Sequence, residues 1–343
     1  GYVRGGYVDQ ITYSWPNAAH KIRFIVADRS DYPAQFDSRT AGIQFVQTFW
    51  SKKRLQAIEI YSDGQGRLAR RYVLTTSVEN GFLVLNGIQE IAADGTRLPA
   101  TTFGYLPLAG YSGNCVQGQS EGGWKPWLIG VSTGYGGSIG FNYTAPLGMP
   151  WFQNGQTMGP NEGGKCWYRY RVREVTVDPG VGAVMRTAYE YRNATDDGPH
   201  PGIWQGTEFR GHPRVRVIRR NADGSVAAYT DHYFHQGLGQ ITATGICGEN
   251  VADANGLQGR EYKRVDYDGA GNALAVQTTR WQIRDLGNGR RFVAPVAVCE
   301  FPNGGSGPYR RTDYAYDDYG NVIRIAQYGD ATRTGDEATV ERA

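Results

Sequence analysis

Apolar and polar residues alternate with a period of two along most of the chain. Val215 and Val217 share one face of such a segment, whereas Arg214 and Arg216 share the other, and positions 169–174 alternate in the same way. This alternation is typical of a β-strand with one wetter and one drier face. No long segment carries apolar residues at helical spacing. We therefore expect an all-β fold with little helix.

Short turns of Asp, Asn and Gly separate the alternating stretches. Alternating arms around such turns predict β-hairpins, because Gly and Asn tolerate the positive φ angles that tight turns require. The expected turns are centred on positions 63–64, 94–95, 178–180, 223–224, 268–269 and 319–321. They recur at intervals of about 20–45 residues, a spacing that indicates a degenerate repeat architecture.

One region interrupts this pattern, since positions 129–165 are crowded with Gly, Pro, Asn and aromatic residues. Its part 138–144 still alternates as a strand. The rest is expected to be a long irregular loop that crosses an edge of the sheet. The chain is accordingly divided into N-terminal hairpins at 1–110, a Gly- and aromatic-rich strand and irregular loop at 111–165, and hairpin repeats at 166–343.

Composition agrees with a fold of strands and turns. Among 343 residues there are 48 Gly, 23 Tyr and 8 Trp, and the net charge is +3 from 36 basic and 33 acidic residues. This balance does not call for a nucleic acid or an anionic membrane as partner, and no apolar run is long enough to span a bilayer. The chain starts without Met or a signal-peptide core, which predicts a fragment or a processed segment.

The four cysteines are Cys115, Cys166, Cys247 and Cys299. They form no Cys-x-x-Cys pair, so the spacing does not indicate a zinc site. An even number in a β-rich chain is compatible with two disulfides. Pairing by neighbourhood would join Cys115 to Cys166 and Cys247 to Cys299, which is one of three connectivities. Four buried free thiols are the alternative.

Candidate catalytic and metal-binding patterns do not combine into a site. His232 and His235 are three residues apart on an expected strand, so their side chains should point to opposite faces. Positions 266–272 resemble a calcium loop only faintly, because the closing bidentate Glu is absent, and a hairpin turn accounts for the same residues. There is no nucleophile elbow and no phosphate loop. We expect no catalytic residue, no metal site and no cofactor.

Several tryptophans cluster in the Gly-rich region. They could form a stacking platform for a glycan, although aromatic residues in a β-sheet more often serve packing. The candidate contact residues are Trp124, Trp127, Trp151 and Trp167.

Several segments of the chain resemble the RHS/YD-repeat family. YAYDDYGNVIRIAQYGD at 314–330 resembles the YD repeat, in which a Tyr-Asp strand end and a Gly-Asn turn precede a returning strand. GTEFRG at 206–211 and YFHQG at 233–237 resemble segments of the B components of bacterial Tc toxins and related RHS proteins. GYGGSIGFNYTA at 134–145 and LPATTFGY at 98–105 are similar to stretches that precede them in that family.

The resemblance implies structural roles for the motif residues. They are Glu208, Phe209, Arg210 and Gly211 in the first motif, and Tyr316, Asp317, Tyr319, Gly320 and Asn321 in the YD-like motif. For Glu208 an ion pair with Arg210 or a nearby Arg is expected. The chain departs from the family where Gly211-His212-Pro213 replaces Gly-Phe-Gly. It also lacks the autoproteolytic motif and the calcium repeats found elsewhere in such proteins, so neither cleavage nor toxicity is assigned to it.

The family implies a long antiparallel hairpin ribbon that curls into a spiral shell. The chain is then expected to be a non-enzymatic wall segment of a large secreted or surface protein, which encapsulates a C-terminal effector or forms an extracellular contact structure. Its partners would be the remainder of the same polypeptide or further shell segments. The alternatives are a glycan- or receptor-binding module that uses exposed aromatics, and a self-assembling extracellular fibre that pairs through open hairpin edges.

Overall fold

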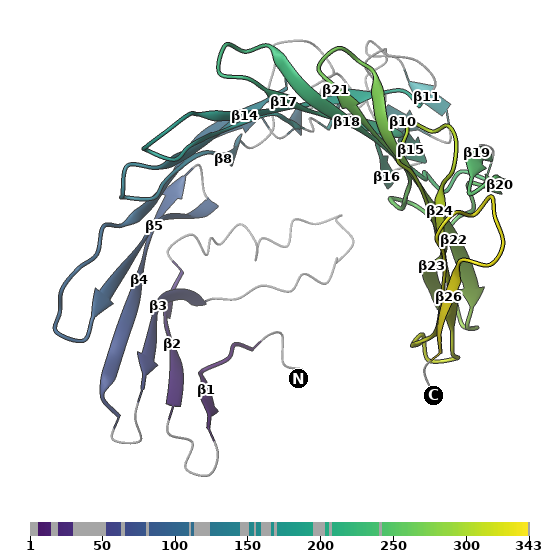
Figure 1. Ribbon diagram of the computed structural model, residues 1–343. Coiled ribbons are helices and arrows are strands. Elements are labelled where there is room, and N and C mark those ends of the chain that lie inside the picture. Colours follow the sequence, from purple (N-terminus) through teal and green to yellow (C-terminus); the bar gives the residue numbers. More distant parts are fainter. Residues whose placement is uncertain are drawn as a thin grey trace. The chain divides into compact units, whose positions relative to one another are not determined.

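The computed structural model consists of β-strands and contains no helix in the residues that it describes (Figure 1). These residues are 6–14, 20–29, 53–62, 66–79, 82–109, 111–112, 124–144, 151–153, 156–158, 166–167, 170–194, 203–205, 208–239 and 242–341. None of them forms a helix that could cross a membrane. The prediction of an all-β, antiparallel fold with little helix is confirmed.

The chain divides into two compact units. The first comprises 1–142, 165–169 and 177–184, and the second comprises 143–164, 170–176 and 185–343. The division of the sequence at 110 and 165 stays a prediction.

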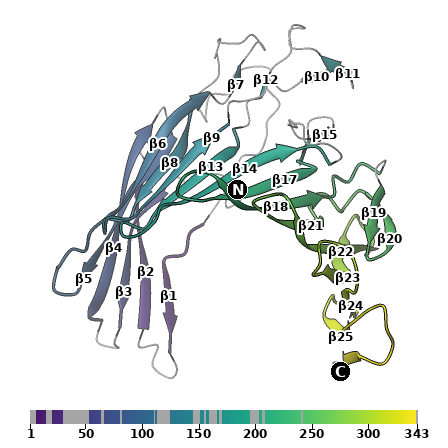
Figure 2. The same cartoon turned by 45° about the horizontal axis from the view of Figure 1, so that its top comes forward.

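The first unit is an antiparallel meander in which each strand of the main sheet pairs with the next (Figure 2). Its strands are β1 (Gln10–Tyr13), β2 (His20–Asp28), β3 (Lys53–Tyr61), β4 (Leu68–Glu79), β5 (Phe82–Ala92), β6 (Thr101–Ala109), β8 (Trp124–Ser132) and β9 (Ser138–Tyr143). The short strands β7 (Tyr111–Ser112) and β12 (Cys166–Trp167) pair separately. The expected strand at 138–144 is therefore present, and positions 129–132 belong to β8 rather than to a loop.

The turns of the first unit follow the predicted chemistry. Between β5 and β6 the carboxylate of Asp94 accepts a hydrogen bond from the N–H of Thr96 at 2.9 Å, and Gly95 has a φ of +87°. Gly134, in the turn between β8 and β9, has a positive φ, and a Cβ there would lie 2.5 Å from the carbonyl oxygen of Ala100. Glycine is thus required at 134 both by conformation and by space. The turn expected at 63–64 lies outside the described residues.

The second unit is built on a main sheet in the order β14-β17-β18-β21-β22-β23-β24-β25-β26. Its elements are most of β13 (Val172–Asp178), then β14 (Met185–Arg192), β17 (Arg214–Arg220), β18 (Val226–Phe234), β21 (Glu261–Asp268), β22 (Ala273–Asp285), β23 (Arg291–Phe301), β24 (Arg310–Tyr316), β25 (Val322–Tyr328) and β26 (Glu337–Glu341). Three short hairpins stand apart from it: β10 (Trp151–Gln153) with β11 (Gln156–Met158), β15 (Ile203–Gln205) with β16 (Glu208–Gly211), and β19 (Thr242–Ile246) with β20 (Glu249–Ala252).

The predicted turns at 223–224, 268–269 and 319–321 separate consecutive strands of this sheet, and the turn at 178–180 separates β13 from β14. One detail is corrected. The residue with positive φ in the turn after β21 is Gly271, at +91°, and not Gly269. Gly269 is needed for a different reason, because a Cβ there would lie 2.4 Å from the carbonyl oxygen of Val226. The turn between β22 and β23, which has Gly287 at its tip, was not predicted.

Candidate functional site

The connection between β18 and β21 is tied to the main sheet at several points. Residues 235–260, which we call the crossing segment, leave the sheet, form the β19–β20 hairpin and return to β21 (Figure 1). The hairpin closes with a two-residue turn at Cys247 and Gly248, whose φ angles are +48° and +83°. Positive φ at both turn residues matches the twist of the flanking strands in such hairpins.

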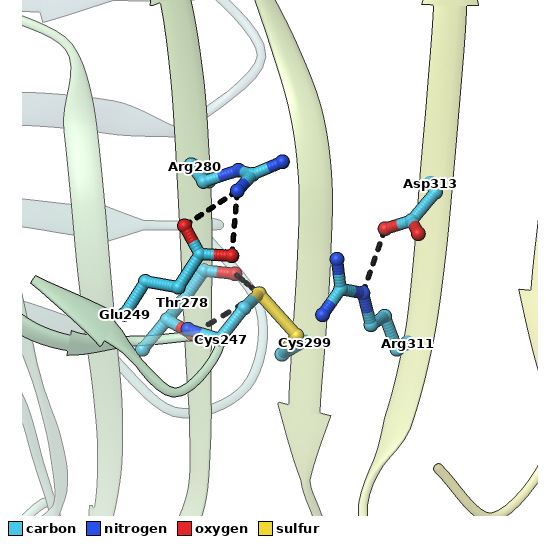
Figure 3. The surroundings of a disulfide bond; sticks show 7 residues. All are labelled: Cys247, Glu249, Thr278, Arg280, Cys299, Arg311 and Asp313. Atoms are coloured by element: carbon cyan, nitrogen blue, oxygen red, sulfur yellow. Dashed lines mark hydrogen bonds and ion pairs between the residues drawn. A yellow bond between two sulfur atoms is a disulfide. The ribbon is translucent and has the colours of Figure 1, made fainter. Parts of the chain in front are cut away.

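A disulfide joins the tip of this hairpin to β23 (Figure 3). Cys247 and Cys299 have Cα atoms 5.4 Å apart, and both residues are buried. The N–H of Cys247 also donates to Oγ1 of Thr278 at 3.0 Å. This bond is one of the two that pairing by neighbourhood proposed. Of the other two cysteines, Cys115 lies outside the described residues, and only the backbone of Cys166 is described.

Two ion pairs lie close to the disulfide (Figure 3). Nη1 of Arg280 donates to both carboxylate oxygens of Glu249, at 2.6 and 2.5 Å. Nε of Arg311 donates to Asp313 at 2.8 Å, and this hydrogen bond raises the pKa of the Arg311 guanidinium. Each carboxylate is thus matched by one guanidinium.

A single carboxylate organises the beginning of the crossing segment. Oδ1 of Asp253 accepts hydrogen bonds from the N–H groups of Gln236 and Gly237, both at 2.9 Å, and Oδ2 accepts from the N–H of Leu238 at 3.1 Å. Nδ1 of His235 lies 3.1 Å from Oδ1. Burial by itself would raise the pKa of Asp253, but the bonds from His235 and the backbone outweigh it and lower the pKa. Asp253 therefore holds a buried stretch of main chain as an ionised acceptor.

Arg210 of the first motif, GTEFRG, binds the main chain of the YFHQG segment at 233–237. Nη1 of the buried Arg210 donates to the carbonyl oxygens of Gly237 at 3.1 Å and Gln236 at 3.4 Å, and to Oδ1 of Asn255 at 3.5 Å. Nε2 of Gln236 in turn donates to the carbonyl oxygen of His212 at 3.2 Å. A guanidinium suits this task because it presents several donors in one plane.

The other residues of the first motif also lie in β16. Gly211 has a φ of +90° with open space where a Cβ would be, so it is favoured by conformation alone. Glu208 and Phe209 lie in β16, opposite Gln205 and Trp204 of β15. Their side chains are outside the described part, so the ion pair expected for Glu208 stays a prediction.

A second polar network crosses strands β17, β18 and β21. Nε and Nη2 of Arg216 each donate to the fully buried carboxylate of Asp231 at 2.7 Å, and Arg214 lies 3.7 Å from it. The guanidinium of Arg216 also stacks on Tyr229, whose ring stacks on Tyr267 with centroids 4.5 Å apart. Burial raises the pKa of Tyr267 to about 12. Cross-strand contacts of this kind stabilise a sheet within its own layer.

The YD-like motif forms a capped turn. Oδ1 of Asp317 accepts hydrogen bonds from the N–H groups of Tyr319 and Asn321, and Oδ2 accepts from Nδ2 of Asn321 at 2.9 Å. Gly320 has a φ of +90°. Tyr316, at the end of the preceding strand, donates its hydroxyl to the carbonyl oxygen of Pro295 at 2.8 Å. The five residues that carry the YD resemblance thus lie in a single hairpin end, in which Tyr319 is exposed.

The same capped turn occurs after β21. Oδ1 of Asp268 accepts from the N–H groups of Ala270 and Asn272, and Oδ2 accepts from Nδ2 of Asn272 at 2.8 Å. The pattern Asp-x-x-Gly-Asn therefore specifies one geometry at two places. This geometry confirms that positions 266–272 form a hairpin turn.

The histidines and tryptophans do not converge in the described structure. Nδ1 of His232 lies 2.7 Å from Glu261, whereas His235 contacts Asp253. Among the described residues no group of three or more His, Cys, Asp or Glu could hold a metal ion. Trp127 is partly buried. The side chains of the other proposed glycan contacts, at 124, 151 and 167, are outside the described part, so the stacking platform stays a prediction.

A groove of about 640 Å³ lies between β20 and the main sheet. All four residues of β20 line one wall. The opposite wall includes Trp281, Tyr314, Arg280 and Asp313. Sequence reasoning did not find this groove, because β20 is 28 to 65 residues away in the chain from the other lining residues and meets them only through the fold of the crossing segment.

Sequence reasoning also missed Asp253. Its one local signal is the Gly- and Asn-containing stretch that follows it, which is typical of a turn capped by an Asp. The hydrogen-bond partners at 235–238 are too far away in the chain for that signal to reveal them.

Comparison with known proteins gives likenesses at the level of structure only. No protein-family model matches the chain, and no curated protein is similar to it. A crystal structure of TcdB2-TccC3 with Cdc42 is 12% identical over 82% of this chain, and one of TcdB2-TccC3 is 13% identical over 80%, both with TM-scores of 0.42. A Photorhabdus luminescens Tc holotoxin pore is 14% identical over 83%, with a TM-score of 0.42.

These structures contain Tc toxin components, the class of protein that the sequence motifs resemble. The chain spans 18% of the length of each matched chain.

Proposed function

We propose that this chain is a wall segment of a large secreted or surface RHS/YD-repeat protein that encapsulates a C-terminal effector. One observation carries the proposal. Three of the motif residues serve the main chain: Arg210 and Tyr316 donate to carbonyl oxygens, and Asp317 accepts from turn N–H groups. Side chains used in this way maintain a scaffold, since each satisfies backbone groups that would otherwise be left without partners.

The way the sheet is stabilised supports a wall one layer thick. Most globular domains bury apolar residues between two layers. Here the fully or nearly buried apolar residues of the described chain are few and mostly small, such as Ala57, Ala188, Ala297 and Ala326. Hydrogen-bond networks within the layer, such as that of Arg216 with Asp231, stabilise the sheet in place of a large apolar core.

The disulfide supports an extracellular or cell-surface location. Disulfides persist in oxidising compartments and are rare where thiols are kept reduced. The Cys247–Cys299 bond joins positions 52 residues apart and anchors the crossing segment, so the fold makes structural use of it.

Single-particle imaging of the complete native polypeptide tests the proposal. We expect a hollow, closed particle whose wall contains the strands described here, and an enclosed region that protease cuts only after denaturation. A particle without an internal cavity would overturn the encapsulating role. Extended filaments would instead favour the self-assembling fibre, and a glycan array that responds to Trp151→Ala would favour the glycan-binding alternative.

A further inference from the structure

We propose that Asn288 is a site of spontaneous covalent modification, at which the side-chain amide is lost as ammonia and the residue becomes aspartate or isoaspartate. The reaction needs no partner other than water. The proposal concerns one turn of the main sheet and does not rest on the wall function.

The chemistry requires an asparagine that is followed by glycine. The main-chain nitrogen of the glycine loses its proton to hydroxide and attacks Cγ of the asparagine. The new N–Cγ bond closes a succinimide ring, and the Cγ–Nδ2 bond breaks to release ammonia, which takes a proton from water. A second water opens the ring, so the net reaction consumes one water and releases one ammonia. Glycine hinders ring closure least because it has no Cβ, and asparagine is accordingly among the thermolabile residues.

The chain contains the Asn-Gly dipeptide at six positions. Two of them, at 80 and 154, lie outside the described residues. The other four begin at Asn86, Asn255, Asn288 and Asn303. Because the dipeptide is the same in each, the surrounding structure decides which of these four reacts.

Asn288 and Gly289 are the central residues of the turn between β22 and β23. The N–H of Arg290 donates to the carbonyl oxygen of Gly287 at 3.0 Å and closes the turn. The central φ angles of +52° and +74° match type I′. The closing bond engages only the outer residues, and within the described structure the N–H of Gly289 has no hydrogen-bond acceptor. All residues from 285 to 291 are exposed, so the attacking nitrogen and its target are open to solvent.

The space around this turn also permits ring closure. A Cβ on Gly289 would meet no atom within 4 Å. The side-chain amide of Asn288 forms no hydrogen bond in the part of the chain that the structure describes, so nothing there holds it away from the main chain. The amide can therefore turn towards the nitrogen of Gly289 without breaking another contact.

The dipeptide at Asn303 has the opposite surroundings. The N–H of Gly304 donates to the carbonyl oxygen of Leu274 at 3.0 Å. A Cβ on Gly304 would lie 2.4 Å from the carbonyl oxygen of Ala273. Attack by this nitrogen would break a main-chain hydrogen bond in a tightly packed place. Asn303 is therefore protected by the fold, although its local sequence is equally reactive.

The two remaining dipeptides are also restrained. Gly287 has no counterpart at Asn86, because Gly87 lies inside β5 and pairs with both neighbouring strands. Oδ1 of Asn255 accepts a hydrogen bond from Nη1 of Arg210 at 3.5 Å, and its carbonyl oxygen accepts from Arg291 at 2.8 Å. Among the four described dipeptides, the one at Asn288 thus has both a free nitrogen and a free amide.

The modification changes the turn in two ways. It adds one negative charge to a chain whose net charge is +3. Isoaspartate also adds a methylene group to the main chain, so the two-residue turn no longer closes with the same geometry. Arg291 follows this turn and binds the carbonyl oxygen of Asn255 at 2.8 Å. This bond between the hairpin and the crossing segment is therefore a contact that lies next to the change.

Peptide mapping of the full chain after incubation in water enriched in heavy oxygen tests the proposal. The isotope marks residues that react during the incubation rather than during the digest. Trypsin cleaves after Arg284 and Arg290 and so isolates Asn288 in a short peptide. We expect Asn288 to react at least tenfold faster than Asn303 in the folded chain. In concentrated urea, where the packing around Gly304 is lost, the two rates should agree within about threefold.

Gly289→Ala should slow the reaction at Asn288 at least tenfold, because the added Cβ hinders ring closure. The matched control is Gly224→Ala, which places the same substitution at another left-handed turn glycine with open space around it. It should leave the rate at Asn288 within twofold of the native value. Circular dichroism shows whether each variant is folded.

Three results would overturn the proposal. They are an intact Asn288 in the folded chain when the urea-treated chain has reacted completely, a reaction at Asn303 as fast as at Asn288 in the folded chain, and a folded Gly289→Ala chain that reacts as fast as the native one. The first two comparisons use the native sequence alone and hold even where a variant fails to fold. None of them depends on the particle images that test the wall function.

Discussion

The carboxylate of Asp253 lies 3.1 Å from Nδ1 of His235, and both side chains are almost completely buried. Between them they secure the start of the crossing segment, because Asp253 also accepts three backbone N–H groups. The contact joins a family-like motif to a residue 18 positions further on.

We expect Asp253→Ala to destabilise the second unit by about 3 kcal/mol, because it leaves buried donors without acceptors. Urea unfolding measures the loss. Asp318→Asn is the matched control. Asp318 is exposed, and its ion pair with Arg284, at 3.6 Å, is screened by solvent, so this substitution should change stability very little. Equal effects of the two substitutions would contradict the role of Asp253.

Asp253 also makes stability depend on acid. Its pKa is lowered in the folded chain, so it contributes stability above the ordinary pKa of a carboxyl, and this contribution is lost as the pH falls through the folded pKa. Acid unfolding of the native chain should therefore be steeper than that of Asp253→Asn. The comparison is made by circular dichroism from pH 6 downward, with Asp318→Asn expected to follow the native curve.

Reduction of the disulfide should loosen the crossing segment without unfolding the main sheet. In the chain-entropy model, a cross-link that closes 52 residues stabilises the folded state by about 4 kcal/mol. Cys247→Ala with Cys299→Ala should lower the free energy of unfolding by a comparable amount. Hydrogen exchange should rise in β19 and β20 before it rises in β22. Uniformly faster exchange across β21–β24 would show that the bond holds the sheet rather than the segment.

Two turn glycines should respond differently to the same substitution. Gly224 and Gly320 have φ angles of +87° and +90°. A Cβ at 224 would meet nothing within 4 Å, whereas one at 320 would lie 2.6 Å from the ring of Phe292. Gly224→Ala should lower the free energy of unfolding by about 1–2 kcal/mol, through backbone strain alone. Gly320→Ala should lower it by at least about 1 kcal/mol more, because of the clash with the ring.

A double-mutant cycle with Phe292→Leu checks the cause of that difference. The additional cost of Gly320→Ala should shrink when the ring is removed, while Gly224→Ala should add independently. Costs that are equal in the presence and absence of Phe292 would show that the clash is not responsible.

Alkaline pH should destabilise the second unit through its buried tyrosines. Burial raises the pKa values of Tyr262 and Tyr267 to about 12, above the ordinary value of 10.0. The folded state therefore holds these protons more tightly than the unfolded state, and their contribution to stability is full below pH 10 and lost as the pH rises towards 12. The pair Tyr262→Phe and Tyr267→Phe should flatten this fall in denaturation curves measured across the window. The exposed Tyr319→Phe should not.

Local structure followed from local pattern. Period-two alternation predicted the strands around positions 138–144 and 214–219, and Gly-Asn turns predicted the hairpin end at 317–321, because each depends on residues within a few positions of one another. The separate environments of His232 and His235 have a different cause, because β18 ends at Phe234 and His235 already belongs to the crossing segment.

Long-range contacts depended on the tertiary structure. The sequence by itself determined a chain of antiparallel hairpins with its cysteines in an even number, and it left three pairings open. Only the fold decided that Cys247 meets Cys299, that Arg210 binds the backbone at 236–237 and that Glu249 of β20 pairs with Arg280. These contacts join positions 26 to 52 residues apart. The physical reason is that the crossing segment folds back on the sheet, and nothing in its local pattern encodes where it lands.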